Sequence, residues 1–291
     1  MPLTLTPVHR RWPLALLGGC ALASAMSARA DEAAPEPAAE APSRFAYQVG
    51  LAASYKPTYT GSDRMDWGVR PVVGLRWGRL RLTSSQANLI DGLSDGSRAA
   101  GASYTLVDSA RWTSGVALRF DNGRSSGDDP RLAGLPDVRA TVRARVYGRY
   151  SFDASAVDQR AVGATLSTDL LGRGGGVTAS LDLSRRVRLT PSVQWTHGIG
   201  VGAGNATNLM SYVGVPAASA AVSGLPAYTP GAGLTDVHLG TGLTWLLHPR
   251  WRIGGAVNAS HFLGPVADSP LTLRSGNWGV VFGLVYISGQ D

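Results

Sequence analysis

The segment "DVRATVRARVYGRY" (Asp137–Tyr150) decides the fold, because basic and apolar residues alternate along it. Successive side chains of an extended strand point to opposite faces, so residues of one parity share a face. One face then carries Val142 and Val146, and the other carries Arg143 and Arg145. On a helix these arginines would be scattered around the axis. A strand that is apolar on one side and cationic on the other needs two different surroundings.

The same alternation recurs along the rest of the chain. Most of the alternating segments run for about 9–14 residues, the length that a tilted transmembrane strand requires. Unpaired backbone amides are costly in hydrocarbon, so a membrane-spanning sheet has to close on itself. The sequence therefore predicts an all-β fold, a closed antiparallel transmembrane β-barrel of about 12 strands. The predicted strands begin near Phe45, Trp67, Leu80, Ala100, Ala110, Asp137, Val157, Gly176, Val187, Leu234, Arg250 and Gly276.

The predicted connections differ in length at the two ends of the barrel. Short turns on one side and long loops on the other are typical of an outer-membrane barrel with short periplasmic turns and longer extracellular loops. The link at 172–175 is the one exception. Short turns are predicted at Gly78, Asp108, 151–156, Arg185-Arg186 and His248-Pro249, and long loops at 58–65, 88–97, 122–136, 200–233 and 263–275.

The first 30 residues have the pattern of a secretory signal peptide. A basic start and a short apolar run precede the small-x-small sequence Ala28-Arg29-Ala30, so we expect cleavage after Ala30 and export to the Gram-negative outer membrane. Residues 31–43 form an acidic Ala/Pro-rich linker, and residues 44–288 form the predicted barrel. Cys20 lies within the signal, so the mature chain has no cysteine. The precursor has a formal net charge of +7, and removal of the signal with Arg10, Arg11 and Arg29 leaves 24 basic and 20 acidic residues, a net charge near +4. This positive charge is assigned to the lumen and to lipopolysaccharide contacts, not to nucleic acid.

A soluble β-sandwich or a lipocalin-like barrel would also show alternating strands. Its interior would be apolar and its exterior charged. In this chain, however, Trp and Tyr recur at the ends of the apolar faces, as expected at a lipid boundary. Charged residues make up only 16% of the chain and fall largely on one parity and in loops. Both features favour the membrane barrel.

Four loop motifs bring a family resemblance that extends from Phe45 to Tyr286. They are "YTGSD" (59–63), "NLMSYVGV" (208–215), "SGLPAY" (223–228) and "ADSPL" (267–271), and together they resemble the MipA/OmpV outer-membrane family. The resemblance implies a non-enzymatic scaffold, without cofactor, that links a lytic murein transglycosylase to a penicillin-binding murein synthase. The residues that carry it are Gly61, Ser62, Asp63, Tyr212, Gly214, Val215, Ser223, Gly224, Leu225, Pro226, Tyr228, Ala267, Asp268, Ser269 and Pro270.

The arginines of the polar parity lead to a second hypothesis. They would line the lumen, because an arginine facing lipid near the midplane costs about 2–4 kcal/mol. A basic lumen is compatible with a small porin-like channel for small or anionic solutes. Alternatively, the arginines pair with Asp108, Asp121, Asp169 and Asp182 and fill the interior. The candidate lumen residues are Arg70, Arg76, Arg111, Arg119, Arg139, Arg143, Arg145 and Arg149.

Two further features leave alternatives open. The loop 200–233 is apolar for an exposed loop, so it either folds inward as a plug or packs on its neighbours at the rim. Asp236 and His238 share the lumen-facing parity and would be the best acid–base pair for a hydrolase. No serine lies in a recognisable nucleophile elbow, and the histidines lack metal-ligand spacing. We therefore expect no enzymatic activity.

Overall fold

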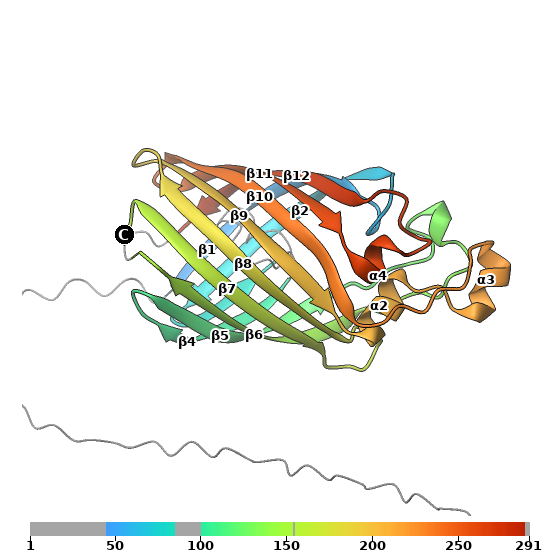
Figure 1. Ribbon diagram of the computed structural model, residues 1–291. Coiled ribbons are helices and arrows are strands. Elements are labelled where there is room, and N and C mark those ends of the chain that lie inside the picture. Colours follow the sequence, from blue (N-terminus) through green and yellow to red (C-terminus); the bar gives the residue numbers. More distant parts are fainter. Residues whose placement is uncertain (1–44, 85–99, 154, 289–291) are drawn as a thin grey trace, which may run out of the picture. The chain divides into compact units, whose positions relative to one another are not determined.

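The computed structural model describes residues 45–84, 100–153 and 155–288, all within one compact unit, Ala41–Asp291 (Figure 1). The predicted signal peptide and linker, and the predicted loop at 88–97, lie outside the described residues. Within the described part, no helix combines the length and the apolar character that a membrane-crossing helix requires.

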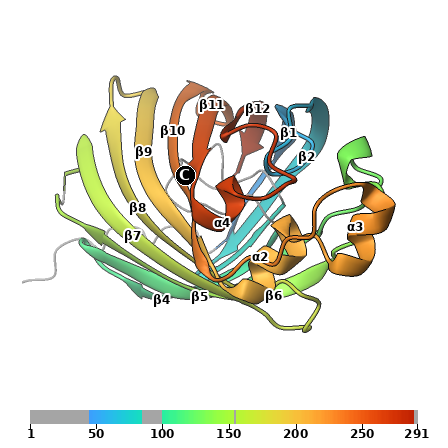
Figure 2. The same cartoon turned by 45° about the vertical axis from the view of Figure 1, so that its right-hand side comes forward.

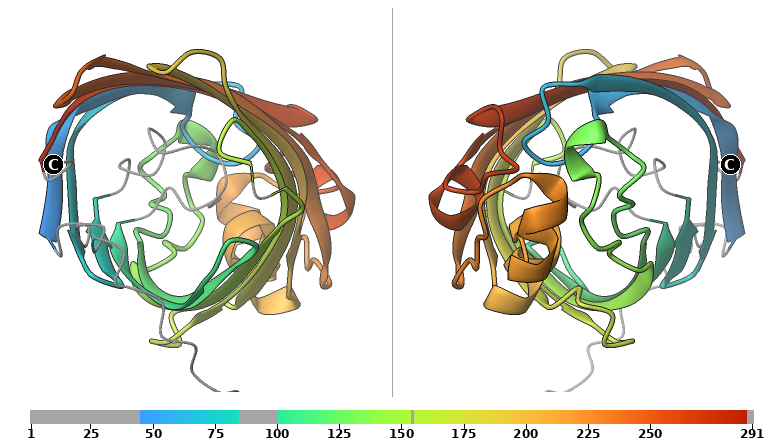
Figure 3. Two further views of the ribbon diagram at one scale, coloured as in Figure 1. Left: turned by 90° about the vertical axis from the view of Figure 1, so that its left-hand side faces the viewer. Right: turned by 90° about the vertical axis from the view of Figure 1, so that its right-hand side faces the viewer.

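The described residues contain twelve antiparallel strands that form a closed barrel, seen end-on in Figure 3. Each strand pairs with its neighbours in sequence, and β1 pairs with β12 to complete the ring. The architecture predicted from the alternating residues is therefore confirmed. The strands are β1 (Phe45–Pro57), β2 (Met65–Trp77), β3 (Leu80–Thr83), β4 (Gly101–Asp108), β5 (Trp112–Asp121), β6 (Thr141–Ser151), β7 (Asp158–Asp169), β8 (Val177–Arg188), β9 (Val193–Gly204), β10 (Gly233–His248), β11 (Trp251–Phe262) and β12 (Gly276–Ile287).

Two strand boundaries differ from the prediction. The turn expected at Arg185-Arg186, with a strand from Val187, is wrong: β8 continues to Arg188, which pairs with Gln194 of β9. The turn is made by residues 189–192, where the Thr190 hydroxyl accepts hydrogen bonds from the backbone N–H groups of Ser192 and Val193. The predicted start of the sixth strand at Asp137 is also too early. Strand β6 begins at Thr141, and residues 137–140 belong to the preceding loop.

Apolar side chains cover the outside of the barrel. Leu51, Val69, Leu239 and Phe282 lie in different strands, and each is more than half exposed (61%, 69%, 54% and 56%). Exposure of this kind, repeated around a closed sheet, requires a lipid environment, because large contiguous apolar patches are rare on soluble monomers.

Aromatic rings mark both ends of this apolar surface. Tyr55 packs against Trp67 and Trp278 at the end with the long loops, with centroid distances of 4.8 and 5.8 Å. Tyr286 packs against Trp251 at the end with the short turns, with a centroid distance of 5.4 Å. Amphipathic rings at two levels are typical of a protein that crosses a bilayer, so the chain is an outer-membrane β-barrel with its short turns in the periplasm.

Three of the outer loops carry short helical elements, which lie at the end of the barrel opposite the short turns in Figures 1 and 2. The loop 205–232 holds two helices, so it is shorter and more ordered than the predicted loop 200–233. The elements are η2 (Pro130–Leu132), α2 (Ala206–Val213), α3 (Ala217–Ser223) and α4 (Gly264–Ala267).

Candidate functional site: an outer loop cap and an arginine-lined lumen

The four loop motifs meet in one place at the outer end of the barrel. Tyr59, Val215, Leu225 and Leu271, one from each motif, share a buried cluster with Leu132 and Leu135 of the loop 122–140. Burial of these side chains favours one arrangement of loops that are far apart in sequence. We call these packed loops (58–64, 122–140, 205–232 and 263–275) the outer cap.

Hydroxyl groups of the motif residues hold the outer cap together. The Tyr59 hydroxyl donates to the carbonyl oxygen of Leu271 at 2.9 Å, and the Ser269 hydroxyl donates to the carbonyl oxygen of Val213 at 2.6 Å. The Tyr228 hydroxyl donates to the carbonyl oxygen of Pro265 at 2.9 Å. Burial raises the pKa of Tyr59 to about 12, so its hydroxyl keeps the proton that it donates. These hydroxyls therefore cross-link the loops.

Asp129 joins two of the cap loops through its carboxylate. It accepts hydrogen bonds from the Thr58 hydroxyl at 2.7 Å, the Ser62 hydroxyl at 3.2 Å and the backbone N–H of Arg131 at 2.9 Å. Burial opposes ionisation, but these donors outweigh it and lower the pKa of the Asp129 carboxyl. The side chain also caps η2, so the loop 58–64 is tied to a helical turn of the loop 122–140.

Helix α2 anchors the outer cap to the barrel wall. The Tyr212 hydroxyl donates to the carboxylate of Asp121 at the outer end of β5, with distances of 3.0 and 2.9 Å to the two oxygens. Burial raises the pKa of Tyr212, and the charge of Asp121 adds to this effect. Arg124 donates to the carbonyl oxygen of Tyr212 at 3.1 Å. Of the two alternatives for the loop 200–233, these contacts favour packing on its neighbours.

Within the motif segments, the glycines serve the backbone. Gly61 and Gly224 adopt positive φ angles of 93° and 69°, which side chains rarely allow. The remaining motif residues lie in three of the four cap loops (58–64, 205–232 and 263–275): Ser62, Asp63, Gly214, Ser223, Pro226, Ala267, Asp268 and Pro270. The structure thus brings together every motif residue singled out from the sequence.

The eight candidate lumen arginines fall into three groups. Arg76 lines one lumen cavity, and Arg119 and Arg149 line another. Arg143 and Arg145 make hydrogen bonds within the wall. The other three lie apart: Arg70 is an exposed residue of β2, Arg111 lies in the turn between β4 and β5, and Arg139 lies in the loop before β6.

Arg143 is a structural link. Its guanidinium contacts Asp121 at 3.3 Å, the carbonyl oxygen of Gly175 at 2.8 Å and the Thr178 hydroxyl at 3.1 Å. The Arg143 side chain is 10% exposed, so these partners satisfy a largely buried charge. This pair matches the alternative in which arginines and aspartates fill the interior.

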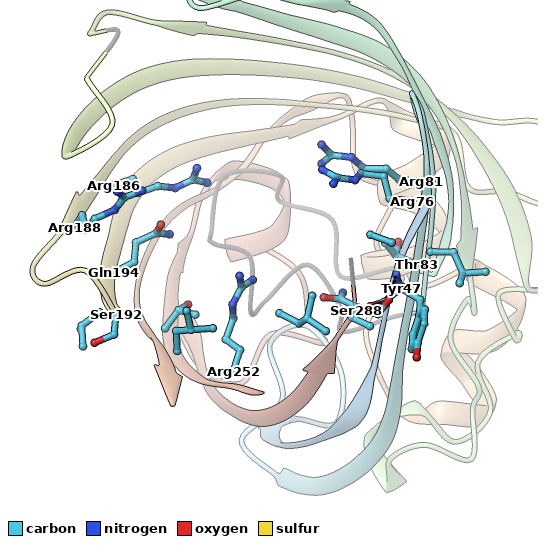
Figure 4. Close-up of a pocket in the computed structure, with 18 of the residues that line it drawn as sticks. Tyr47, Arg76, Arg81, Thr83, Arg186, Arg188, Ser192, Gln194, Arg252 and Ser288 are labelled. Carbon is cyan, nitrogen blue, oxygen red and sulfur yellow. Dashed lines mark hydrogen bonds between the residues drawn. The ribbon is translucent and has the colours of Figure 1, made fainter. Parts of the chain in front are cut away.

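The arginine cavity lies at the periplasmic end of the lumen and has a volume of about 560 Å³. Its lining includes strand ends and the turn residues Pro191 and Ser192. Figure 4 shows guanidinium groups reaching into it from several strands. The basic lining residues are Arg76, Arg81, Arg186, Arg188 and Arg252.

Sequence reasoning found only Arg76 of this set. Arg186 and Arg188 were missed because the turn was placed at Arg185-Arg186, whereas both residues share the lumen face of β8. Arg81 and Arg252 lie at polar-parity positions near strand starts, so a stricter use of parity would have identified them.

A second cavity of about 370 Å³ shares Arg81, Thr83 and Arg186 with the arginine cavity. It also contains Asp108 and Asp182, so its lining carries both signs of charge. The two cavities adjoin along the lumen. Among the described residues, aspartates offset the arginines in the second cavity but not in the arginine cavity at the periplasmic end.

The proposed acid–base pair has a third partner. His238 contacts Asp236 through Nδ1 and Asp182 through Nε2, each at 2.8 Å. Both ring nitrogens face carboxylates, and the nearby Thr235 hydroxyl donates to Asp236. A catalytic histidine needs one nitrogen directed at a nucleophile, and this cluster directs neither. Across the described strands and loops, no set of three or more acidic, His or Cys side chains forms a metal-binding group.

Several solved outer-membrane proteins are similar to this chain at low identity. An outer-membrane channel from Pseudomonas putida F1 is 10% identical, with a TM-score of 0.47, and the alignment covers 88% of this chain and 100% of the channel. OmpT of Vibrio cholerae is 7% identical, with a TM-score of 0.40 and coverage of 85% and 99%. At this level the similarity says nothing about substrate or activity. No curated protein matches the chain.

The family model described as "MltA-interacting protein MipA" matches residues 49–288. The match covers most of the chain, from the first strand to the end of the last strand. It includes the whole outer cap and the arginine cavity apart from Ala46, Tyr47 and Gln48. The chain therefore belongs to the MipA family.

Proposed function

We propose that this protein is a non-enzymatic scaffold that links a lytic murein transglycosylase to a penicillin-binding murein synthase at the outer membrane. Membership of the MipA family, whose description names an interaction with MltA, is the observation that carries the proposal. Contacts with outer-membrane lipid and lipopolysaccharide belong to the same proposal.

The structure supports a contact from the periplasmic side. At the outer end, the motif hydroxyls are bound to neighbouring loops, which leaves them unavailable to a partner. At the periplasmic end, where the short turns lie, strand ends and the turn residues Pro191 and Ser192 line the arginine cavity. Murein-processing enzymes that meet the barrel from the periplasm would therefore contact these turns.

Site-specific crosslinking tests the scaffold and its orientation together. Because the only cysteine is Cys20 in the predicted signal, a single new cysteine would be unique in the mature chain. Leu189→Cys places it in a periplasmic turn and Val222→Cys in outer helix α3, at residues that are 54% and 75% exposed. We expect envelope crosslinks to a transglycosylase or synthase from position 189 only. Crosslinks to neither enzyme, or equal crosslinks from both positions, would contradict the proposal.

The adjoining lumen cavities favour a small anion-selective channel as a second candidate. Arg149 of β6 and Arg186 of β8 both line the second lumen cavity. Planar-bilayer recordings should then show discrete steps with anion preference, and Arg149→Ala with Arg186→Ala should reduce that preference. A bilayer that stays silent with correctly folded protein would exclude a channel.

A further inference from the structure

The arginine cavity holds several positive charges close together, and their mutual repulsion disfavours the folded barrel. Arg76 and Arg81 are direct cross-strand partners on β2 and β3, and both line the cavity. Arg186 and Arg188 are alternate residues on one face of β8. Like charges placed directly opposite each other destabilise a sheet. An anionic ligand between them would reverse this effect.

Several of these arginines have no acidic partner in the described part of the chain. Arg143, Arg160 and Arg185 each pair with an aspartate elsewhere in the barrel. Among the described residues, by contrast, no carboxylate pairs with Arg76, Arg81 or Arg188, and no acidic residue lines the arginine cavity. A cavity of one charge sign within low-dielectric walls focuses its field on whatever enters.

The volume and the polar lining of the arginine cavity fit a short stretch of peptide. The volume of about 560 Å³ lies in the range of about 300–1,000 Å³ that is usual for ligand pockets, so it admits a few residues of extended chain but no folded domain. Gln48, Gln194 and Ser192 bring amide and hydroxyl groups that can hydrogen-bond a peptide backbone. Guanidinium groups bind carboxylates through paired hydrogen bonds.

We propose that the arginine cavity is a docking site for an acidic peptide segment of a periplasmic partner protein. The inference rests on the proposed scaffold function, because it supplies that scaffold with a point of attachment. The lining residues Pro191 and Ser192 belong to a periplasmic turn, so the cavity can be reached from the periplasm. A carboxylate-rich tail or loop would enter between β8 and the β2–β3 pair (Figure 4).

Binding of fluorescein-labelled hexaglutamate to the full-length mature chain in zwitterionic nanodiscs tests the site. We expect saturable, salt-sensitive binding, and no binding of labelled hexalysine. Arg81→Gln with Arg188→Gln should weaken hexaglutamate by about tenfold or more, because two charge-assisted contacts are lost. Arg70→Gln with Arg111→Gln removes the same charge outside the cavity and should leave the affinity unchanged. An equal loss in both double variants would overturn the site.

Further measurements distinguish failure of the docking site from failure of the scaffold proposal. The single variants Arg81→Gln and Arg188→Gln replace the double variant if it fails to fold, and unaltered affinity in both singles would overturn the proposal. Inorganic tripolyphosphate that displaces the peptide at equal concentration would show a site for small polyanions instead. A double variant that loses the peptide but still crosslinks to the murein enzymes would leave the scaffold standing without this site. Peptide binding without any enzyme crosslink would leave the site and remove the scaffold.

Discussion

Gly200 of β9 provides the space for the cluster around His238. A Cβ atom at this position would lie 2.4 Å from Asp182 Oδ1, 2.5 Å from His238 Nε2 and 2.9 Å from the carbonyl oxygen of Leu181. The first two atoms belong to side chains that would have to move, and the third belongs to the backbone. The absence of a side chain at residue 200 therefore permits the contact between β8 and β10 across β9.

Gly200→Ala should break the Asp182–His238 contact and lower the free energy of unfolding by about 1–2 kcal/mol, because two partly buried polar groups lose their hydrogen-bond partner. Urea unfolding of the barrel in lipid vesicles, followed by tryptophan fluorescence, measures this change. Gly148→Ala is the matched control, because no atom lies within 4 Å of its Cβ position. An equal effect of the two substitutions would show that the cluster contributes nothing to stability.

The His238 cluster also shows how far single residues can be placed from sequence. Alternation put Asp236 and His238 on the same face, and the structure places them in contact. The third member, Asp182, is 56 residues away and reaches His238 only through the register of β8, β9 and β10. The alternation of residues along a strand shows which face a residue lies on, but it does not show how neighbouring strands are aligned. The contact between Asp182 and His238 was therefore not predictable from the sequence.

At the scale of the element, η2 depends on the ionised form of Asp129. The pKa of this carboxyl is lowered in the folded chain, so its stabilising effect is complete above the ordinary carboxyl range and is lost as the pH falls through the folded value. We expect the loop 122–140 to become accessible to pepsin only below about pH 4. Limited pepsin digestion of the barrel in vesicles, followed by mass spectrometry, measures this access.

Asp129→Asn should expose the same loop to pepsin already at about pH 4, because the amide cannot accept all three hydrogen bonds as an anion does. Asp63→Asn is the control, since Asp63 is an exposed residue of a neighbouring cap loop. If the two variants are digested alike at every pH, the link between Asp129 and the loop 58–64 is not the element that holds the cap.

Strands were easier to predict than turns and loops. Twelve alternating segments fix twelve strands, because the membrane imposes one pattern on every strand. Turns obey no such pattern: two adjacent arginines at 185 and 186 suggested a polar turn, yet Arg185 pairs with Asp158 on the outer face and Arg186 enters the lumen. The outer cap was foreseen as motifs but not as one structure, because its hydrogen bonds join loops up to 212 residues apart.

At the scale of the whole molecule, the two faces of the barrel wall should respond oppositely to the same substitution. Leu166 is 54% exposed on the outer face of β7, and its neighbour Thr165 lines the second lumen cavity. Leu166→Arg places a charge in lipid and should destabilise the barrel by about 2–4 kcal/mol. Thr165→Arg should be tolerated, because it faces a polar lumen with room for a side chain. Folding into vesicles across a urea series measures both variants. If Thr165→Arg proved as harmful as Leu166→Arg, or if both were neutral, the apolar face would not be the one in contact with lipid, and the membrane-spanning fold would have to be abandoned.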